Sequence, residues 1–175
     1  MEILNLLILE DKKDYKCFSE LKRLLKENEE FKQVIVSGVE QGKIKGFDLE
    51  LWNKIRRQNI RIINNFDDVF FNGSNIGYCT VASKQLSYSL DECYLCGGIL
   101  PVLSGTANCE DGSHTWILYN NEIIDTTLML IIDEDYADKL GYVEENRYDP
   151  NVDPIYISAK QFTNDSTLCD EKKLD

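Results

Sequence analysis

The chain has 175 residues, of which 43% are hydrophobic and 29% are charged, a balance that suits one compact domain with a buried core and excludes a disordered chain. Its formal net charge of −12 argues against a nucleic-acid-binding protein and against docking on an anionic membrane, because like charges repel. We therefore expect a single domain over residues 1–175 with neither nucleic acid nor membrane as a partner.

The N-terminal stretch MEILNLLILEDKKD contains an apolar run that no basic residue precedes and that is too short to span a bilayer. We interpret this run as a buried first element and expect a cytoplasmic protein without an export signal. The six cysteines would then lie in a reducing compartment, where thiols, metal ligands or a nucleophile are more common than disulfides.

The first part of the chain, residues 1–70, is predicted to be helical. Residues 14–32 have the pattern of an amphipathic helix, and residues 34–46, with three glycines, are interpreted as a linker. A second helix is predicted to begin near Asp48. An Asn-, Asp- and Gly-rich loop is expected at residues 64–77.

The predicted core, residues 71–160, begins with a helix whose first turn contains Cys79 and whose apolar face continues through Ala82 and Leu86. The stretch YLCGGILPVL then predicts a buried strand with a break or bulge at its Gly-Gly pair. Helices first and antiparallel strands afterwards indicate the α+β fold class.

A β-hairpin is predicted next, since HTWILY and EIIDTT flank Asn120-Asn121, a pair that tolerates the positive φ angles of a two-residue turn. Residues 129–141 are interpreted as a strand end or short helix, and residues 145–154 as a loop. We expect a last strand from Pro154 and a flexible acidic tail at residues 161–175.

A nucleophilic cysteine needs a lowered pKa, a base within reach and a group that orients the base. The first turn of a helix lowers the pKa of Cys79, because unpaired N–H groups and the helix dipole favour a thiolate. The base of a Cys–His enzyme would have to be His114, the only histidine of the chain.

The orienting group follows from the register of the hairpin. A two-residue turn pairs Trp116 with Asp125 and His114 with Thr127, and cross-strand partners share a face. Asp125 then lies diagonally from His114 across the two strands, with roughly 7–8 Å between their backbones, which an Asp–His hydrogen bond can bridge. A slip of one residue would move Asp125 to the other face.

Each member of this set also has a structural interpretation. Cys79 would be a small core residue, His114 a satisfied polar group and Asp125 a residue of the hairpin end. Their joint arrangement favours a function. An oxyanion hole could use the Cys79 backbone N–H and a side chain such as Asn75 or Asn72.

Three features together resemble the core of the transglutaminase-like branch of the papain-like cysteine enzymes: a cysteine opening a helix, the strand YLCGGILPVLSG, and SHTWILYNNEIIDTT. In that family an H-x-W strand is followed by a strand carrying D-x-T. The matching residues are Cys79, His114, Trp116, Asp125 and Thr127. The resemblance covers about residues 75–130.

The resemblance implies a papain-like core, in which the nucleophile helix packs on a small antiparallel sheet, and acyl transfer through a thioester. Cys79 would attack an amide of a peptide or protein, His114 would protonate the leaving amine, and Asp125 would hold the imidazole tautomer, without a cofactor. Trp116 would support the site. Thr80 replaces the aromatic residue that usually follows the nucleophile. Hydrolysis, deamidation, transamidation and an inactive interaction fold all remain open, as does the oligomeric state.

A zinc site is the alternative for the same stretch. Cys93-x-x-Cys96-Gly, then Cys109 twelve residues later and His114 four residues after that, is acceptable Cys3His spacing. This set would take His114 as a ligand, remove the base and make the protein a zinc-stabilised binding module. We rank it second, because Cys93 and Cys96 would point to opposite faces of one strand.

Overall fold

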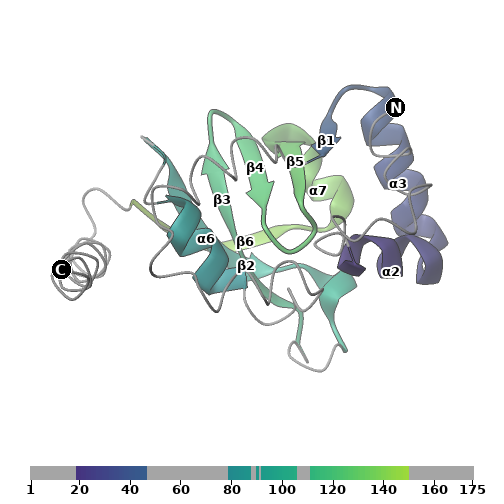
Figure 1. Ribbon diagram of the computed structural model, residues 1–175, viewed down its shortest axis with the longest axis horizontal. Helices are drawn as coiled ribbons and strands as arrows, with labels where there is room; N and C mark the ends of the chain where they lie inside the picture. The colour runs from purple at the N-terminus through teal and green to yellow at the C-terminus, as the bar shows by residue number, and fades with distance from the viewer. Residues whose placement is uncertain (1–18, 47–78, 88–89, 91, 106–110, 150–175) are drawn as a thin grey trace, which may run out of the picture.

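The computed structural model describes residues 19–46, 79–87, 90, 92–105 and 111–149. Within these ranges the chain combines helices with one antiparallel sheet, which confirms the α+β class (Figure 1). Five predicted elements lie outside the described residues: the buried first element, the helix from Asp48, the loop at residues 64–77, the strand from Pro154 and the acidic tail.

The sheet has six strands in the order β1-β5-β4-β3-β2-β6, and all neighbours are antiparallel. Its strands are β1 (Ile44–Gly46), β2 (Tyr94–Ile99), β3 (Ser113–Tyr119), β4 (Glu122–Asp125), β5 (Leu130–Asp133) and β6 (Val143–Tyr148). The central strand β3 is buried along most of its length, which makes it the scaffold for side chains that must be shielded from water.

Four helices and two 3-10 turns surround the sheet within the described residues. They are α2 (Ser19–Glu27), α3 (Glu29–Glu40), α6 (Cys79–Ser87), α7 (Ala137–Leu140), and the turns Pro101–Leu103 and Glu134–Tyr136. Helix α6 packs on β2 and β3, whereas α2 and α3 lie at the β1 end of the sheet, with α3 against α7 (Figure 1). None of the described helices is long and apolar enough to cross a membrane.

The first predicted helix, residues 14–32, is interrupted within its described part. Helix α2 ends at Glu27, and Asn28 caps a new helix by accepting a hydrogen bond from the Phe31 backbone N–H at 2.9 Å. The prediction of one continuous helix was therefore wrong, because an asparagine within a charged run can act as the N-cap of a second helix.

The prediction of a linker at residues 34–46 was also wrong. Helix α3 continues to Glu40, and β1 follows after a short turn. Position 38 of the helix is a glycine because a Cβ there would lie 2.4 Å from Ile44 Cδ1 and 2.8 Å from Tyr136 Cε1. The glycine therefore marks a close approach of the helix to its neighbours, not a flexible segment.

The predicted Gly-Gly bulge in β2, the strand after α6, is confirmed. The register between β2 and β6 shifts between Gly97 and Gly98, and a Cβ at Gly98 would lie 2.0 Å from the Val143 carbonyl oxygen. The strand ends at Ile99, before the 3-10 turn.

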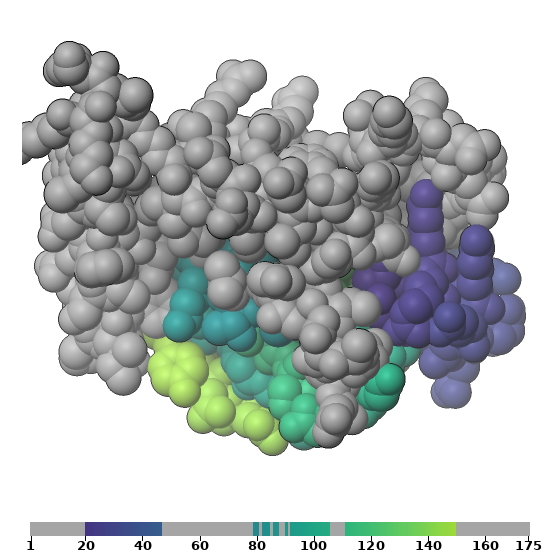
Figure 2. Space-filling view, turned by 60° about the horizontal axis from the view of Figure 1, so that its bottom comes forward, coloured from purple at the N-terminus to yellow at the C-terminus, as the bar shows by residue number. Residues whose placement is uncertain are grey.

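A further correction concerns residues 145–154, which we predicted to be a loop. Their first four residues belong to β6, an edge strand whose six residues are all exposed and form part of the molecular surface (Figure 2). With no buried face, this strand lacks the alternation of apolar and polar residues by which strands are recognised in a sequence.

The predicted hairpin is confirmed with its register. Tyr119 pairs with Glu122 and Ile117 with Ile124, and the turn residues Asn120 and Asn121 have φ angles of 51° and 60°. Both angles lie in the left-handed region that a two-residue turn between twisted strands requires. Because the register is fixed, the predicted face of the hairpin is fixed with it.

Candidate active site

Cys79 is the first residue of α6, and its side chain is half-buried. Two contacts hold the helix on the central strand: Ser83 Oγ donates to the Thr115 carbonyl oxygen at 3.1 Å, and the hydroxyls of Thr80 and Thr115 lie 2.9 Å apart. Since Thr115 follows His114 directly, these contacts place the start of α6 beside the histidine.

His114 is the second residue of β3, and its side chain is 1% exposed. Its Nε2 atom lies 2.7 Å from Asp125 Oδ2, so the diagonal pair expected from the hairpin register is formed. The other group that the imidazole influences is the Cys79 thiol, whose pKa His114 lowers. With Nε2 facing Asp125, Nδ1 is the nitrogen left for Cys79.

Asp125, the last residue of β4, is fully buried and has four hydrogen-bond donors. The backbone N–H groups of Thr127 and Leu128 both donate to Oδ1 at 2.8 Å. His114 Nε2 and the Tyr142 hydroxyl share Oδ2, the hydroxyl at 2.6 Å. A carboxylate so surrounded can stay ionised away from water.

Two aromatic rings enclose the imidazole. Trp116, 1% exposed, has its ring centroid 6.0 Å from that of His114, and Tyr142 has its centroid 6.4 Å from the same ring. Trp116 and Tyr142 pack edge to face at 5.1 Å. Trp116 therefore supports the histidine as a packed wall of the site.

The electrostatics of the pair favour a thiolate and an imidazolium. Burial raises the pKa of Cys79, but the hydrogen bond and charge of His114, with smaller contributions from the Thr115 backbone and Thr80, outweigh burial and lower it. Burial likewise opposes protonation of His114, yet the charge and hydrogen bond of Asp125, followed by those of Cys79, raise its pKa to about 10.

Asp125 supplies the negative charge on which this balance depends. Burial alone would raise the pKa of its carboxyl group, but the charge of His114 and the hydrogen bonds from His114, Tyr142 and the Leu128 backbone hold it below the ordinary value. The arrangement can therefore keep an activated thiol next to a proton donor at neutral pH.

The remaining predicted site residues are only partly within the described part of the chain. Asn75 and Asn72, the suggested oxyanion-hole side chains, lie outside the described residues, as does Cys109 of the alternative zinc set. Cys93 donates to the backbone oxygens of Ser87 at 3.4 Å and Leu90 at 3.8 Å.

Cys96, the other described cysteine of the zinc set, is fully buried, and burial followed by the charge of Glu144 raises its pKa to about 12. Among the described residues no group of three His, Cys, Asp or Glu side chains could hold a metal ion. The described part of the chain therefore directs His114 to Cys79 and Asp125, and not to the cysteines of the CxxC pair.

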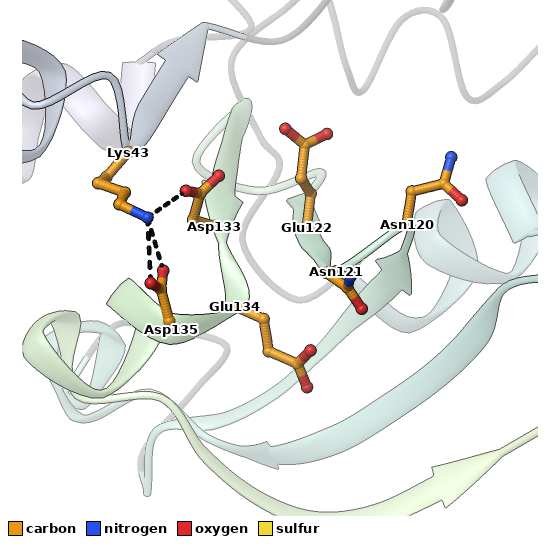
Figure 3. A pocket seen from close by; sticks show the side chains of 7 residues that line it. All are labelled: Lys43, Asn120, Asn121, Glu122, Asp133, Glu134 and Asp135. Carbon is orange, nitrogen blue, oxygen red and sulfur yellow. Dashed lines mark hydrogen bonds and ion pairs between the residues drawn. The ribbon is translucent and has the colours of Figure 1, made fainter.

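A hollow of about 550 Å³ lies around the hairpin turn, away from the cysteine and the histidine (Figure 3). Its lining residues are Lys43, Asn120, Asn121, Glu122, Asp133, Glu134 and Asp135. Lys43 Nζ lies 2.7 Å from Asp133 and 3.0 Å from Asp135, so part of the acidic charge is neutralised. This hollow is a solvated acidic surface and does not contribute to the cysteine site.

Sequence reasoning missed Tyr142 and the bridge from Thr80 to Thr115. Tyr142 lies seventeen residues beyond Asp125, in the turn between α7 and β6. No periodic pattern includes it. The threonine bridge depends on how α6 packs on β3, which the residues alone do not specify.

A scan of family models and searches of curated proteins and of solved structures found no match to this chain.

Proposed function

We propose that the chain is a cysteine-nucleophile hydrolase or acyltransferase, with a transglutaminase-like core, that acts on amide bonds of a peptide or protein. One observation carries the proposal: a buried imidazole has Asp125 at Nε2, 2.7 Å away, and lowers the pKa of the thiol of a helix-opening cysteine. That geometry meets the three requirements of an activated thiol.

The order of the elements supports the transglutaminase-like assignment. The proposed nucleophile opens α6, which packs on the antiparallel sheet. The proposed base lies on β3, the third strand from the β6 edge, and the orienting carboxylate lies on the adjoining strand β4. A papain-like core has the same division of roles between a helix and a sheet.

The reaction proceeds in two steps. Cys79 Sγ attacks the amide carbonyl carbon, the carbon–nitrogen bond breaks, and His114 transfers its Nδ1 proton to the leaving nitrogen. A thioester on Cys79 remains. His114 Nδ1 then takes a proton from water or from an acceptor amine, which attacks the thioester and releases an acid or a new amide with the Cys79 thiolate. Asp125 holds the Nε2 proton throughout.

An activated ester such as p-nitrophenyl acetate tests the proposal without knowledge of the substrate. We expect a burst of p-nitrophenol and an acetyl group on the Cys79 peptide, seen by mass spectrometry. Cys79→Ala should remove both signals, and His114→Gln should slow the burst. Cys93→Ala and Cys96→Ala are the matched controls, since both thiols are buried and burial raises the pKa of Cys96 to about 12. Acetylation spread evenly over the cysteines, or a burst that persists in folded Cys79→Ala, would refute the proposal.

The fate of the acyl group distinguishes the reaction subtypes. Glutamine-containing peptides would release ammonia in both deamidation and transamidation, but only transamidation would incorporate a labelled primary amine. Cleavage of the peptide backbone would instead indicate a protease. Each outcome uses the same thioester, so Cys79→Ala is the common negative control.

A further inference from the structure

Tyr142 and His114 meet at a single oxygen atom. The Tyr142 hydroxyl donates to Asp125 Oδ2 at 2.6 Å, and His114 Nε2 lies 2.7 Å from the same atom. A carboxylate oxygen has two lone pairs, so these two donors fill its capacity. The other oxygen of Asp125 is filled by two backbone N–H groups.

The tyrosine is held as rigidly as its partner. Its side chain is 5% exposed, and its ring packs edge to face on Trp116. Burial, together with the charge of Asp125, raises the pKa of Tyr142 well above the ordinary value, so the hydroxyl stays protonated and acts as a donor. A fixed neutral donor thus faces the carboxylate next to the imidazole.

We propose that Tyr142 is a positioning residue that acts through Asp125 on His114. Its hydroxyl and the two backbone N–H groups fix the carboxylate from three sides, which leaves one lone pair of Oδ2 for the imidazole. The ring must approach along that direction with a proton on Nε2, and Nδ1 is thereby turned to Cys79. This inference rests on the proposed function, since it gives the tyrosine a role in activating the thiol.

A tyrosine elsewhere in the fold provides a matched control. Tyr136 is 3% exposed, and its hydroxyl donates to the Val34 carbonyl oxygen at 3.0 Å, in contact with α3 and not with the cysteine site. Tyr136→Phe and Tyr142→Phe each remove one hydroxyl and one hydrogen bond from a buried ring. A purely structural role predicts the same outcome for both variants, namely a lower thermal midpoint with an unchanged Cys79.

The test is the rate of Cys79 alkylation by iodoacetamide at pH 7, read for each cysteine by peptide mass spectrometry. We expect Tyr142→Phe to slow Cys79 about tenfold, by analogy with the outer hydrogen-bond partners of metal-binding histidines, whose loss costs about 10–100-fold in activity. Tyr136→Phe should react at the wild-type rate. In an Asp125→Asn background, Tyr142→Phe should cause no further slowing, because its effect is transmitted by the carboxylate.

A measurement on the unaltered protein covers the case in which Tyr142→Phe does not fold. His114 is the only histidine, so its Nε2 proton is assigned directly in protein labelled with 15N-histidine. This proton and the Tyr142 hydroxyl proton point at one oxygen and should show a nuclear Overhauser contact. Absence of that contact while the Nε2 proton is observed would overturn the inference.

The outcomes separate this inference from the proposed function. A wild-type Cys79 that reacts no faster than Cys93 or Cys96 would remove the proposed function, and the role of Tyr142 with it. A fast wild-type Cys79 with an unchanged rate in folded Tyr142→Phe would overturn the positioning role alone. Equal slowing by Tyr142→Phe with and without Asp125 would also overturn it, because the effect would then bypass the carboxylate.

Discussion

Asp125→Asn is the substitution that tests the electrostatic argument most directly. It keeps the shape of the side chain and leaves one oxygen for the Thr127 and Leu128 N–H groups, but it places an NH2 group opposite His114 Nε2 and the Tyr142 hydroxyl. The Nε2 proton of His114 and the hydroxyl proton of Tyr142 would then both point at this NH2 group, which is itself a donor. The imidazole can relieve this clash only by accepting at Nε2, which puts its proton on Nδ1, the nitrogen that faces Cys79.

The expected magnitude follows from the balance that sets the protonation of His114. In the native protein the charge of Asp125 overcomes burial and raises the pKa of His114 to about 10. Without that charge, only the smaller contributions of Cys79 oppose burial, so the pKa of His114 falls and both the imidazolium and the Cys79 thiolate are disfavoured at pH 7. We expect alkylation of Cys79 to slow at least about 100-fold, the low end of what a positioned base contributes.

Stability should fall less than reactivity. The variant leaves one or two buried donors without an acceptor, which costs about 1–3 kcal/mol in the free energy of unfolding. Urea unfolding followed by circular dichroism measures this loss, and iodoacetamide at pH 7 with peptide mass spectrometry measures the reactivity of Cys79.

A matched control removes an exposed carboxylate just before β3, the strand that carries His114. Asp111 is exposed and accepts a hydrogen bond from the Ser113 backbone N–H at 3.0 Å, a contact that Asp111→Asn retains. This control should leave the rate of Cys79 unchanged. A folded Asp125→Asn protein that alkylates Cys79 at the wild-type rate would refute the reasoning, since the thiolate would then not depend on the buried charge.

Three further predictions follow from other contacts. In Cys79→Ala protein we expect Asp125 to keep the folded pKa of His114 above its ordinary value of 6.5, so the stability that His114 contributes is complete below pH 6.5 and is lost as the pH rises. The free energy of unfolding, measured with urea, should therefore fall above pH 6.5. His114→Gln should abolish this pH dependence. Gly98→Ala should lower that free energy by about 1–3 kcal/mol, because its Cβ meets a backbone oxygen, whereas Gly97→Ala, with open space, should be tolerated; equal losses would contradict the close approach. Asn28→Ala should cost about 1 kcal/mol, measured in the same way, and Asn28→Asp should restore it if the cap of α3 is the cause.

The hairpin was predictable because two local rules determine it. The Asn120-Asn121 pair selects a two-residue turn, and the alternation of faces along a strand then decides which residues share a side. The pairing of Tyr119 with Glu122 confirms that register. Given the register, the contact between His114 and Asp125 required only side chains long enough to bridge a diagonal.

The features that escaped prediction depend on tertiary packing. Gly38 belongs to a glycine-containing stretch that we predicted to be a linker, yet it lies in helix α3. It is a glycine there because Ile44 of the neighbouring strand leaves no room for a side chain. The edge strand β6 has no buried face and so gives no alternation. Tyr142 reaches Asp125 from a turn between elements, and its place is set by the packing of its ring on Trp116.

The departure of Thr80 from the resembled family has a physical role in this fold. Where an aromatic residue usually follows the nucleophile, the Thr80 hydroxyl contacts the hydroxyl of Thr115 at 2.9 Å, and Ser83 binds the carbonyl oxygen of the same residue. Thr115 adjoins His114 along β3. The helix that carries Cys79 is thus attached to β3 one residue from His114, so a displacement of β3 moves Cys79 and His114 together. The polar contacts of Thr80 and Ser83 thus couple Cys79 to His114 through a single residue, Thr115.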